Sequence, residues 1–386
     1  MNILVCYRNW MNPNIGGVQR VTDTLVKFFV GKGHNLFYLT FLHDENDTYQ
    51  FPAKIYRLPG PVFFSQSNIN YYHDLLFELG IDIIINQDSS NERSSFWLNT
   101  GKHSAKKISI YHTDPLFGIN RKADLSRYIR NLFLRDFILH FFSEPIRFLK
   151  MHRKKREMHV LIKNSNRLVL LSDEFKKLII KELRIDSPKI VSIINPCVSF
   201  HFQKTGIKKK QLLFVARMEI FHKRPDVMLK IWSHIQHKFP DWELLFLGDG
   251  IDRHKIEELA LFMKIKNVRF EGFVDPLPYY QEASVICMTS DYEGFGMVLV
   301  EAMQFGLVPI VFNNWASLKD IINDQVTGIL IETDNMSDYI AKLNQLLSDE
   351  ELRKRISANA KDFVRKFDIE TIGPMWLSLF DKLMKE

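Results

Sequence analysis

The sequence predicts an α/β protein with two Rossmann-like, doubly wound units, each a parallel sheet with helices on both faces. Short runs rich in β-branched residues alternate with longer segments of helical periodicity along the chain. Such alternation is typical of parallel strands joined by helices. The alternation restarts near the middle of the chain, and 386 residues exceed the usual domain size of about 150. We therefore expect two units that face a central cleft, the usual position for a ligand in open α/β sheets.

The first unit is expected at residues 1–198. It begins with a strand at 3–7, a helix at 18–30 and a second strand at 35–40. The same pattern of short apolar runs predicts further strands at 81–85, 107–111, 168–171 and 190–194.

The second unit is expected at residues 199–367, followed by a last helix within 368–386. The stretch 202–211 is polar, has little apolar periodicity and carries a glycine, as is typical of a linker. Beyond it, helical segments alternate with strands expected at 212–215, 243–247, 268–271, 285–289, 308–312 and 329–331.

Composition and cysteine content exclude several classes of protein. Hydrophobic residues make up 46% of the chain and charged residues 25%, which excludes a disordered or coiled-coil chain. The three cysteines are far apart in the sequence, so neither a disulfide scaffold nor a Cys-x-x-Cys metal site is supported. No export signal is recognisable at the N-terminus, and we expect a cytoplasmic protein.

Positive charge is concentrated in one segment. The formal net charge is +7, and residues 121–163 hold twelve Lys or Arg against four Asp or Glu. Apolar residues recur there at three- and four-residue steps, with Arg127, Arg130 and Arg135 between them, which predicts a basic amphipathic helical hairpin. Such helices lie on anionic membranes, but a helix packed on its own domain has the same pattern. The basic run at 151–156 alone is weak support for nucleic-acid binding.

Two common nucleotide-binding motifs are absent from the sequence. Dinucleotide oxidoreductases carry Gly-x-Gly-x-x-Gly between a strand and a helix, whereas Gly31-Lys-Gly33 is followed by no third glycine. The Walker motif is also missing. Neither an NAD-dependent oxidoreductase nor a P-loop NTPase is therefore expected.

The segment 288–303 (MTSDYEGFGMVLVEAM) joins a strand to a helix and holds two glutamates eight residues apart. In an unbroken helix, Glu293 and Glu301 would lie about 80° apart. The Gly-Phe-Gly sequence delays the helix, so that Glu293 falls in the turn and Glu301 in the second helical turn, both facing one cleft. The N–H groups at the helix start suit a phosphate, and carboxylates suit sugar hydroxyls. The alternative is a glycine-rich turn with two solvated glutamates.

Two further clusters suit an anionic ligand. Arg217 follows an apolar strand, and Lys223 precedes a helix that Pro225 opens, so that two cations could neutralise a diphosphate. Gly16 and Gly17 follow the first strand and could let the backbone approach an anion. Solvated cations and a simple tight turn are the alternatives.

Together these motifs resemble glycosyltransferase family 4, retaining nucleotide-sugar transferases of GT-B architecture, over most of the chain. Glu293 and Glu301 match the family's Glu-x7-Glu signature, and Arg217 and Lys223 match its diphosphate-binding cations. His112 is similar in position to a histidine near the transferred sugar, although a structural histidine at a strand end is the alternative. The sequence at 195–197, Asn-Pro-Cys, departs from the family's usual Asn-Gly, and that loop is left out of the donor site. The other positions that match donor-binding residues are Gly16, Gly17, Phe273, Val274, Gly294, Phe295 and Gly296.

The resemblance implies transfer of a sugar from a nucleoside-diphosphate sugar, with UDP as the expected nucleotide, to a hydroxyl of a glycan or polyprenyl-linked glycan. The anomeric configuration would be kept, in surface polysaccharide or lipopolysaccharide assembly. Arg217 and Lys223 would take the place of a divalent metal, Glu301 would hold the ribose and Glu293 the donor sugar. No cofactor, metal ion or nucleic acid is expected, and an anionic membrane surface is an expected partner. The last helix, 369–384, would cross back onto the first domain.

Three alternatives remain at the level of sequence. A non-catalytic protein of the same fold could dock to membrane or nucleic acid through residues 121–163. A hydrolase with two carboxylates is possible, but it does not explain the paired cations. A glycan phosphorylase of this architecture would need a pyridoxal lysine in a much longer chain.

Overall fold

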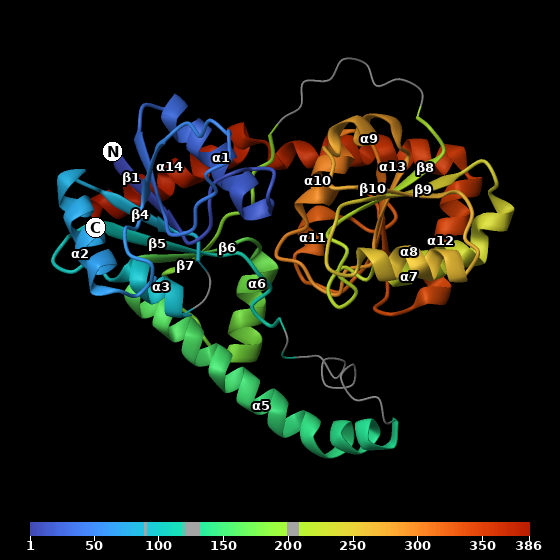
Figure 1. Cartoon of the computed structure of the whole chain (residues 1–386), viewed down its shortest axis with the longest axis horizontal. Coiled ribbons are helices and arrows are strands. Elements are labelled where there is room, and N and C mark those ends of the chain that lie inside the picture. Colours follow the sequence, from blue (N-terminus) through green and yellow to red (C-terminus); the bar gives the residue numbers. More distant parts are fainter. Residues whose placement is uncertain (89–90, 118, 120–131, 199–207) are drawn as a thin grey trace. The chain divides into compact units, whose positions relative to one another are not determined.

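The computed structural model describes residues 1–386 except 89–90, 118, 120–131 and 199–207, and gives no side chains for 91–92 and 132–143. The chain forms two compact units (Figure 1). Unit 1 comprises Met1–Pro196 and Ile369–Glu386, and unit 2 comprises Cys197–Asp368. The first expected boundary, after residue 198, lies two residues beyond the observed one. The second, after residue 367, lies one residue before the observed one. Each unit is a parallel sheet with helices, so the predicted α/β fold class is confirmed.

Unit 1 is built on a parallel sheet that, in its described part, has the strand order β3-β2-β1-β4-β5-β6-β7. The short strand β3, which pairs with β2 at the sheet edge, was not predicted. Its four residues, none of them buried, are too few to show a periodic pattern. The strands are β1 Asn2–Tyr7, β2 Asn35–Thr40, β3 Lys54–Arg57, β4 Ile83–Asn86, β5 Lys106–Tyr111, β6 Arg167–Leu170 and β7 Ile190–Ser192.

The helices of unit 1 include one from the far end of the chain. In Figure 1 the last helix, α14, lies beside α1, and the Phe29 ring of α1 packs 5.1 Å from the Phe380 ring of α14. Gly373 permits this approach, because a Cβ there would come within 2.3 Å of the Phe28 ring. The helices are α1 Gly17–Gly31, α2 Gln66–Glu78, α3 Asn91–Leu98, α5 Leu132–Asn164, α6 Asp173–Leu178, a π-helical turn η1 Ile179–Leu183, and α14 Ile369–Lys385.

The prediction of a helical hairpin within 121–163 is wrong for its larger part. Residues 132–164 form one continuous helix, α5, with Pro145 inside it. Periodicity predicts helix but does not locate a turn, and no glycine interrupts this stretch. Arg127 and Arg130 lie outside the described residues, and the side chain of Arg135 is likewise not described.

Unit 2 has a second parallel sheet, with the order β10-β9-β8-β11-β12-β13 over its described residues. Strand β12 is buried along its whole length, as expected for a strand covered on both faces. The strands are β8 Gln211–Val215, β9 Glu243–Leu247, β10 Val268–Gly272, β11 Val285–Met288, β12 Val308–Phe312 and β13 Ile329–Ile331. The helices are α7 Pro225–Ile235, α8 Arg253–Phe262, α9 Leu277–Glu282, α10 Met297–Gln304, α11 Leu318–Ile321, α12 Met336–Ser348 and α13 Glu350–Phe363, with 3₁₀ turns η2 Gln236–Lys238 and η3 Val364–Phe367.

None of the helices within the described ranges combines the length and the apolar character needed to span a membrane.

Candidate functional site

The order of the strands fixes where a ligand site is expected in unit 2. From β8 the chain proceeds outward through β9 to β10, then returns to the other side of β8 with β11. Such a switch point leaves an opening at the carboxyl ends of the two central strands, where open α/β sheets bind ligands. The loops that begin there are 216–224, after β8, and 289–296, after β11. They contain Arg217, Lys223 and Glu293, as the sequence predicted.

Hydrogen bonds to backbone carbonyls join the two loops. The hydroxyl of Thr289 donates to the backbone carbonyls of Lys223, at 3.1 Å, and Arg224, at 2.8 Å. The Asp291 N–H donates to the His222 carbonyl at 2.9 Å. These contacts hold the backbone of Lys223 next to the chain that leads to Glu293.

Lys223 and Glu293 form an ion pair at the centre of the joined loops. The Lys223 Nζ lies 2.5 Å from Glu293 Oε1, and each side chain is only 12% exposed. Burial raises the pKa of the Glu293 carboxyl, but the charges of Lys223 and His222 outweigh burial and hold that pKa below its usual value. Glu293 is therefore ionised at neutral pH, and each buried charge compensates the other.

The side chain of the second predicted cation, Arg217, is much more exposed than that of Lys223. Its side chain is 64% exposed and its Nη1 lies 2.6 Å from Glu219 Oε1. The other Glu219 oxygen lies 3.4 Å from Nδ1 of His222. Glu219 therefore links Arg217 to His222.

His222 is a residue of the site that the sequence did not single out. Its ring stacks on Tyr292, with centroids 4.0 Å apart and planes inclined by 8°. Its Nε2 donates to the Tyr292 carbonyl at 3.0 Å. Burial, followed by the charge of Lys223, lowers the pKa of His222. Its position directly before Lys223 was the one available sequence signal.

Arg224 is a further residue that the sequence reasoning missed. Its backbone has φ 56°. This is the left-handed region, in which the backbone of a residue other than glycine is strained. Its Nη1 lies 2.8 Å from Asp291 and 2.5 Å from Asp334. These two carboxylates anchor the side chain immediately before α7 begins at Pro225.

The glycines at 294–296 delay the helix, as predicted. Gly296 has φ 96° and precedes the first residue of α10. Glu301 lies in the second turn of α10, is 2% exposed and accepts a hydrogen bond from the Tyr280 hydroxyl at 3.4 Å. The Phe295 side chain is buried and its ring lies 5.7 Å from that of Phe367. Phe295 can therefore offer a ligand its backbone but not its ring.

Two of the other predicted donor-binding residues, Phe273 and Val274, lie at the end of β10. Phe273 directly follows β10 and is 71% exposed, and Val274 beside it is partly exposed. Gly248 follows β9 with φ 136°, and a Cβ on it would lie 2.0 Å from the Ala216 carbonyl oxygen. Any side chain at position 248 would therefore collide with the backbone just before Arg217, so that only glycine fits there.

In unit 1 the switch point lies between β1 and β4; Gly16 and Gly17 follow β1, whereas His112 follows β5, one strand beyond β4. His112 follows β5, and its Nε2 lies 2.5 Å from Gln87 Oε1, the residue after β4. Burial lowers the pKa of His112 to about 4, so the ring is neutral and donates from Nε2. Gly16 has extended backbone and Gly17 begins α1, which has no side-chain cap. A Cβ on Gly17 would meet nothing within 4 Å, so its backbone does not require glycine.

Across the described residues, no group of three or more His, Cys, Asp or Glu side chains is placed to hold a metal ion.

The chain is similar in sequence to known glycosyltransferases. Residues 198–363 match the family model "Glycosyl transferases group 1". An uncharacterised glycosyltransferase of Haemophilus influenzae is 27% identical over 56% of this chain and 62% of its own length. An alpha-1,4-N-acetyl-D-galactosaminyltransferase of Campylobacter jejuni, named for a PP-undecaprenol-linked glycan, is 30% identical over 50% of this chain and 54% of its own length. The chain thus spans somewhat more than half the length of these curated relatives.

The likeness of fold extends further. A crystal structure of TarM from S. aureus, in a complex that contains UDP, matches with a TM-score of 0.77 at 15% identity, covering 98% of this chain and 99% of TarM. Sucrose-phosphate synthase from Thermosynechococcus elongatus matches with a TM-score of 0.79 at 16% identity, covering 100% and 99%. The chain therefore has the GT-B fold, and its residues 198–363, which hold Arg217, Lys223, Glu293 and Glu301, match the group 1 glycosyl transferases.

Proposed function

We propose that this protein is a retaining glycosyltransferase that uses a nucleoside-diphosphate sugar, with UDP as the nucleotide. The observation that carries the proposal is the buried Lys223–Glu293 pair, with Arg217 on the adjoining loop, at the switch point of unit 2. A diphosphate needs cations, and a sugar needs hydrogen-bond acceptors for its hydroxyls. The two loops supply both within one opening.

The proposed reaction breaks the bond between the anomeric carbon and the diphosphate oxygen. Negative charge then develops on the diphosphate, and Arg217 and Lys223 are already in place to stabilise it, as are the N–H groups at the start of α10. The acceptor hydroxyl attacks from the same face and its proton passes to the leaving phosphate. No metal ion is required for this step.

The remaining candidate residues hold the donor. Glu293 would accept hydrogen bonds from the sugar hydroxyls, and Glu301 would accept them from the ribose. The backbone of 294–296 would contact the sugar, and Phe273 and Val274 would line the base. The resemblance also makes His112, Gly16 and Gly17 of unit 1 candidate donor-binding residues.

The proposed acceptor is a glycan or a polyprenyl-linked glycan at the cytoplasmic face of an anionic membrane. The Campylobacter relative is named for a PP-undecaprenol-linked glycan, and an Erwinia amylovora relative, 29% identical over 55% of this chain, is named for amylovoran biosynthesis. The basic helix α5 favours the same location, since Lys and Arg residues are attracted to anionic lipid.

Thermal unfolding with UDP, GDP or ADP tests the donor site. Ligand at 100 times its Kd adds about 2.7 kcal/mol of stability, so the midpoint should rise with UDP. Arg217→Ala and Glu301→Gln should reduce the shift, whereas the exposed Arg355→Ala in the same unit should not. A shift that survives both substitutions, or no shift with any of the three nucleotides, would contradict the proposed site. NMR of the anomeric proton in the product distinguishes retention from inversion.

A further inference from the structure

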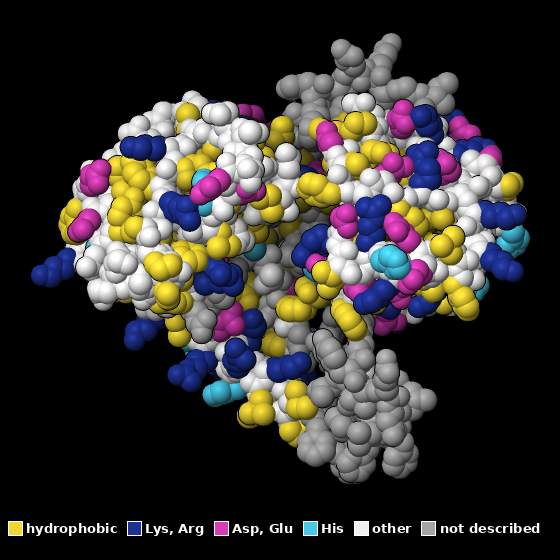
Figure 2. Space-filling view, in the orientation of Figure 1, with side chains coloured by type: hydrophobic (Ala, Val, Ile, Leu, Met, Phe, Trp, Pro, Cys, Tyr) yellow, Lys and Arg dark blue, Asp and Glu magenta, His cyan; other side chains and the backbone are white. Residues whose placement is uncertain are grey.

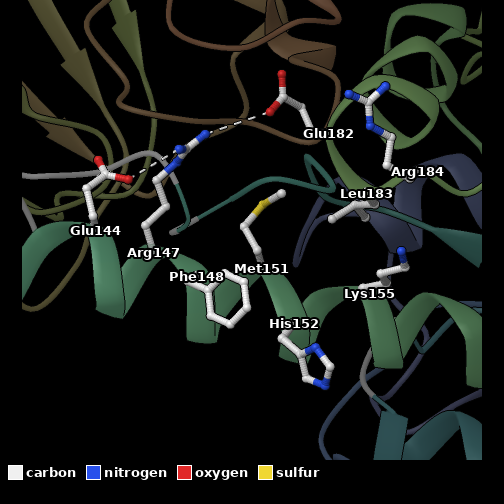
Figure 3. A pocket seen from close by; sticks show the side chains of 9 residues that line it. All are labelled: Glu144, Arg147, Phe148, Met151, His152, Lys155, Glu182, Leu183 and Arg184. Carbon is white, nitrogen blue, oxygen red and sulfur yellow. Dashed lines mark ion pairs between the residues drawn. The ribbon is translucent and has the colours of Figure 1, made fainter.

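A hollow of about 360 Å³ lies in unit 1, between helix α5 and the end of the π-helical turn η1 (Figure 3). Arg147, Met151 and Lys155 are spaced four residues apart and so share one face of α5, and Figure 3 shows them directed toward the segment 182–184. Leu183 is buried and, with Met151, gives the hollow an apolar part. Most of the other lining side chains are charged: Glu144, Arg147, Lys155, Glu182 and Arg184.

The charges around this hollow do not balance. Arg147 lies 3.6 Å from Glu144 and 3.8 Å from Glu182, so both acidic residues of the lining face the same cation. Lys155 and Arg184 line the hollow as well, and in the part of the chain that the structure describes neither has a carboxylate within 4.0 Å. The lining thus holds three cations against two carboxylates, and the two cations without a carboxylate partner favour an anionic group.

The backbone of Arg184 supports a role for this hollow. It has φ 54° at the end of η1, a left-handed conformation that costs a residue other than glycine about 1 kcal/mol. Strained residues and π-helical turns both cluster at functional sites.

Two apolar side chains of the same part of α5 are exposed. Phe148 is 70% exposed and Leu149 67%. Phe148 also belongs to the lining of the hollow (Figure 3). Over 144–164, seven Lys or Arg stand against two Glu, and Figure 2 shows basic and hydrophobic side chains together along the described part of α5. Exposed aromatic and aliphatic side chains beside basic ones are typical of helices that bind at a lipid interface.

We propose that this hollow binds the phosphate headgroup of an anionic membrane lipid. Lys155 and Arg184 contact the phosphate, while Phe148 and Leu149 enter the acyl boundary. The inference rests on the proposed location at an anionic membrane, and it adds a defined lipid site to that location. A single-stranded nucleic acid would use the same cations and could stack a base on Phe148, whereas the acyl region of a lipid covers the aliphatic Leu149 as well.

Vesicle co-sedimentation of the full-length chain tests the site. The vesicles are phosphatidylcholine alone, or phosphatidylcholine mixed with phosphatidylglycerol. The test pair is Lys155→Gln with Arg184→Asn, since asparagine tolerates left-handed backbone. The matched control pair, Arg156→Gln with Lys163→Gln, removes the same charge from exposed positions of α5 outside the hollow. Phe148→Ser tests insertion without changing charge.

The wild type should bind the mixed vesicles and not phosphatidylcholine alone. The test pair should lose at least ten times more affinity than the control pair, and Phe148→Ser should also weaken binding. Equal losses in the two pairs would overturn the site, because they would show diffuse attraction to basic residues. No binding to mixed vesicles, or tight binding to single-stranded RNA that the test pair abolishes, would also overturn it.

The UDP-dependent thermal shift, measured on the same variants, separates this inference from the proposed function. Lys155 and Arg184 belong to unit 1, whereas the donor site belongs to unit 2. The test pair should therefore keep the full shift. Loss of vesicle binding with a normal UDP shift assigns the defect to the lipid site alone.

Discussion

Single buried charges determine the chemistry of the candidate site. Lys223 and Glu293 are nearly excluded from water, and a buried charge is tolerated only when it is compensated. Each residue therefore needs the opposite charge of the other, even when no ligand is bound. The sequence could predict that both residues belong to the site, because both lie in segments that join a strand to a helix. It could not predict their ion pair, since the contact joins residues 70 positions apart.

The same limit explains why His222, Glu219 and Tyr292 were missed. Each is an ordinary loop residue in the sequence, and their arrangement depends on the hydrogen bonds that join the two loops. The stacking of His222 on Tyr292 exists only once Thr289 and Asp291 have fixed the loop spacing. The loops could thus be located from the sequence, whereas the contacts across them could not.

At the residue scale we predict a pH effect from His112. Its pKa in the folded chain is about 4, below the ordinary 6.5, so between these values the unfolded chain binds a proton that the folded chain does not. The free energy of unfolding should therefore fall as the pH drops through 6.5, by about 1–2 kcal/mol at pH 5 for this partly buried ring. Urea unfolding at pH 7 and pH 5 measures it.

His112→Gln should remove this part of the pH dependence, and His159→Gln, an exposed histidine of the same unit, should leave it in place. If His112→Gln and the wild type lose the same stability between pH 7 and pH 5, the imidazole is not held neutral by the fold.

At the scale of elements, glycine patterns were better guides than helical periodicity. The start of α10 was predictable because the Gly-Phe-Gly sequence cannot continue a helix, and Gly296 has the left-handed φ that follows. The basic segment was predictable as helix, but the single continuous helix over 132–164 was not, because apolar periodicity does not show whether a turn interrupts it. Pro145 lies inside α5 and does not end it.

We predict that Gly248→Ala destabilises unit 2 strongly. The new Cβ would lie 2.0 Å from the Ala216 carbonyl oxygen, and φ 136° is unfavourable for alanine. The backbone at the ends of β8 and β9 would have to separate, at a cost of at least about 2 kcal/mol. Urea unfolding measures the change. Gly31→Ala at the end of α1, where a Cβ meets nothing within 4 Å, is the control and should be neutral or slightly stabilising. An unchanged midpoint for Gly248→Ala would show that the turn can relax.

At the scale of the whole molecule, the chain leaves unit 1 at Pro196, forms unit 2 and returns. Helix α14 then completes unit 1, where Phe380 and Trp376 pack around Phe29 of α1. The sequence alone could not place this helix, since its amphipathic pattern would fit either unit. The resemblance to GT-B proteins was what indicated the return.

We predict that Gly373→Leu loosens unit 1 and leaves unit 2 intact. A Cβ at Gly373 already falls 2.3 Å from the Phe28 ring, so a leucine there forces α14 away from α1, and overpacking of this kind costs about 1–3 kcal/mol. Hydrogen exchange followed by mass spectrometry should show faster exchange in α1 and α14 but not in α7 or α12. Ser378→Leu, at an exposed position of the same helix, should change neither. Equal acceleration in both units would mean that α14 stabilises the molecule as one cooperative body, and no acceleration in α1 would mean that the contact with α14 does not hold it.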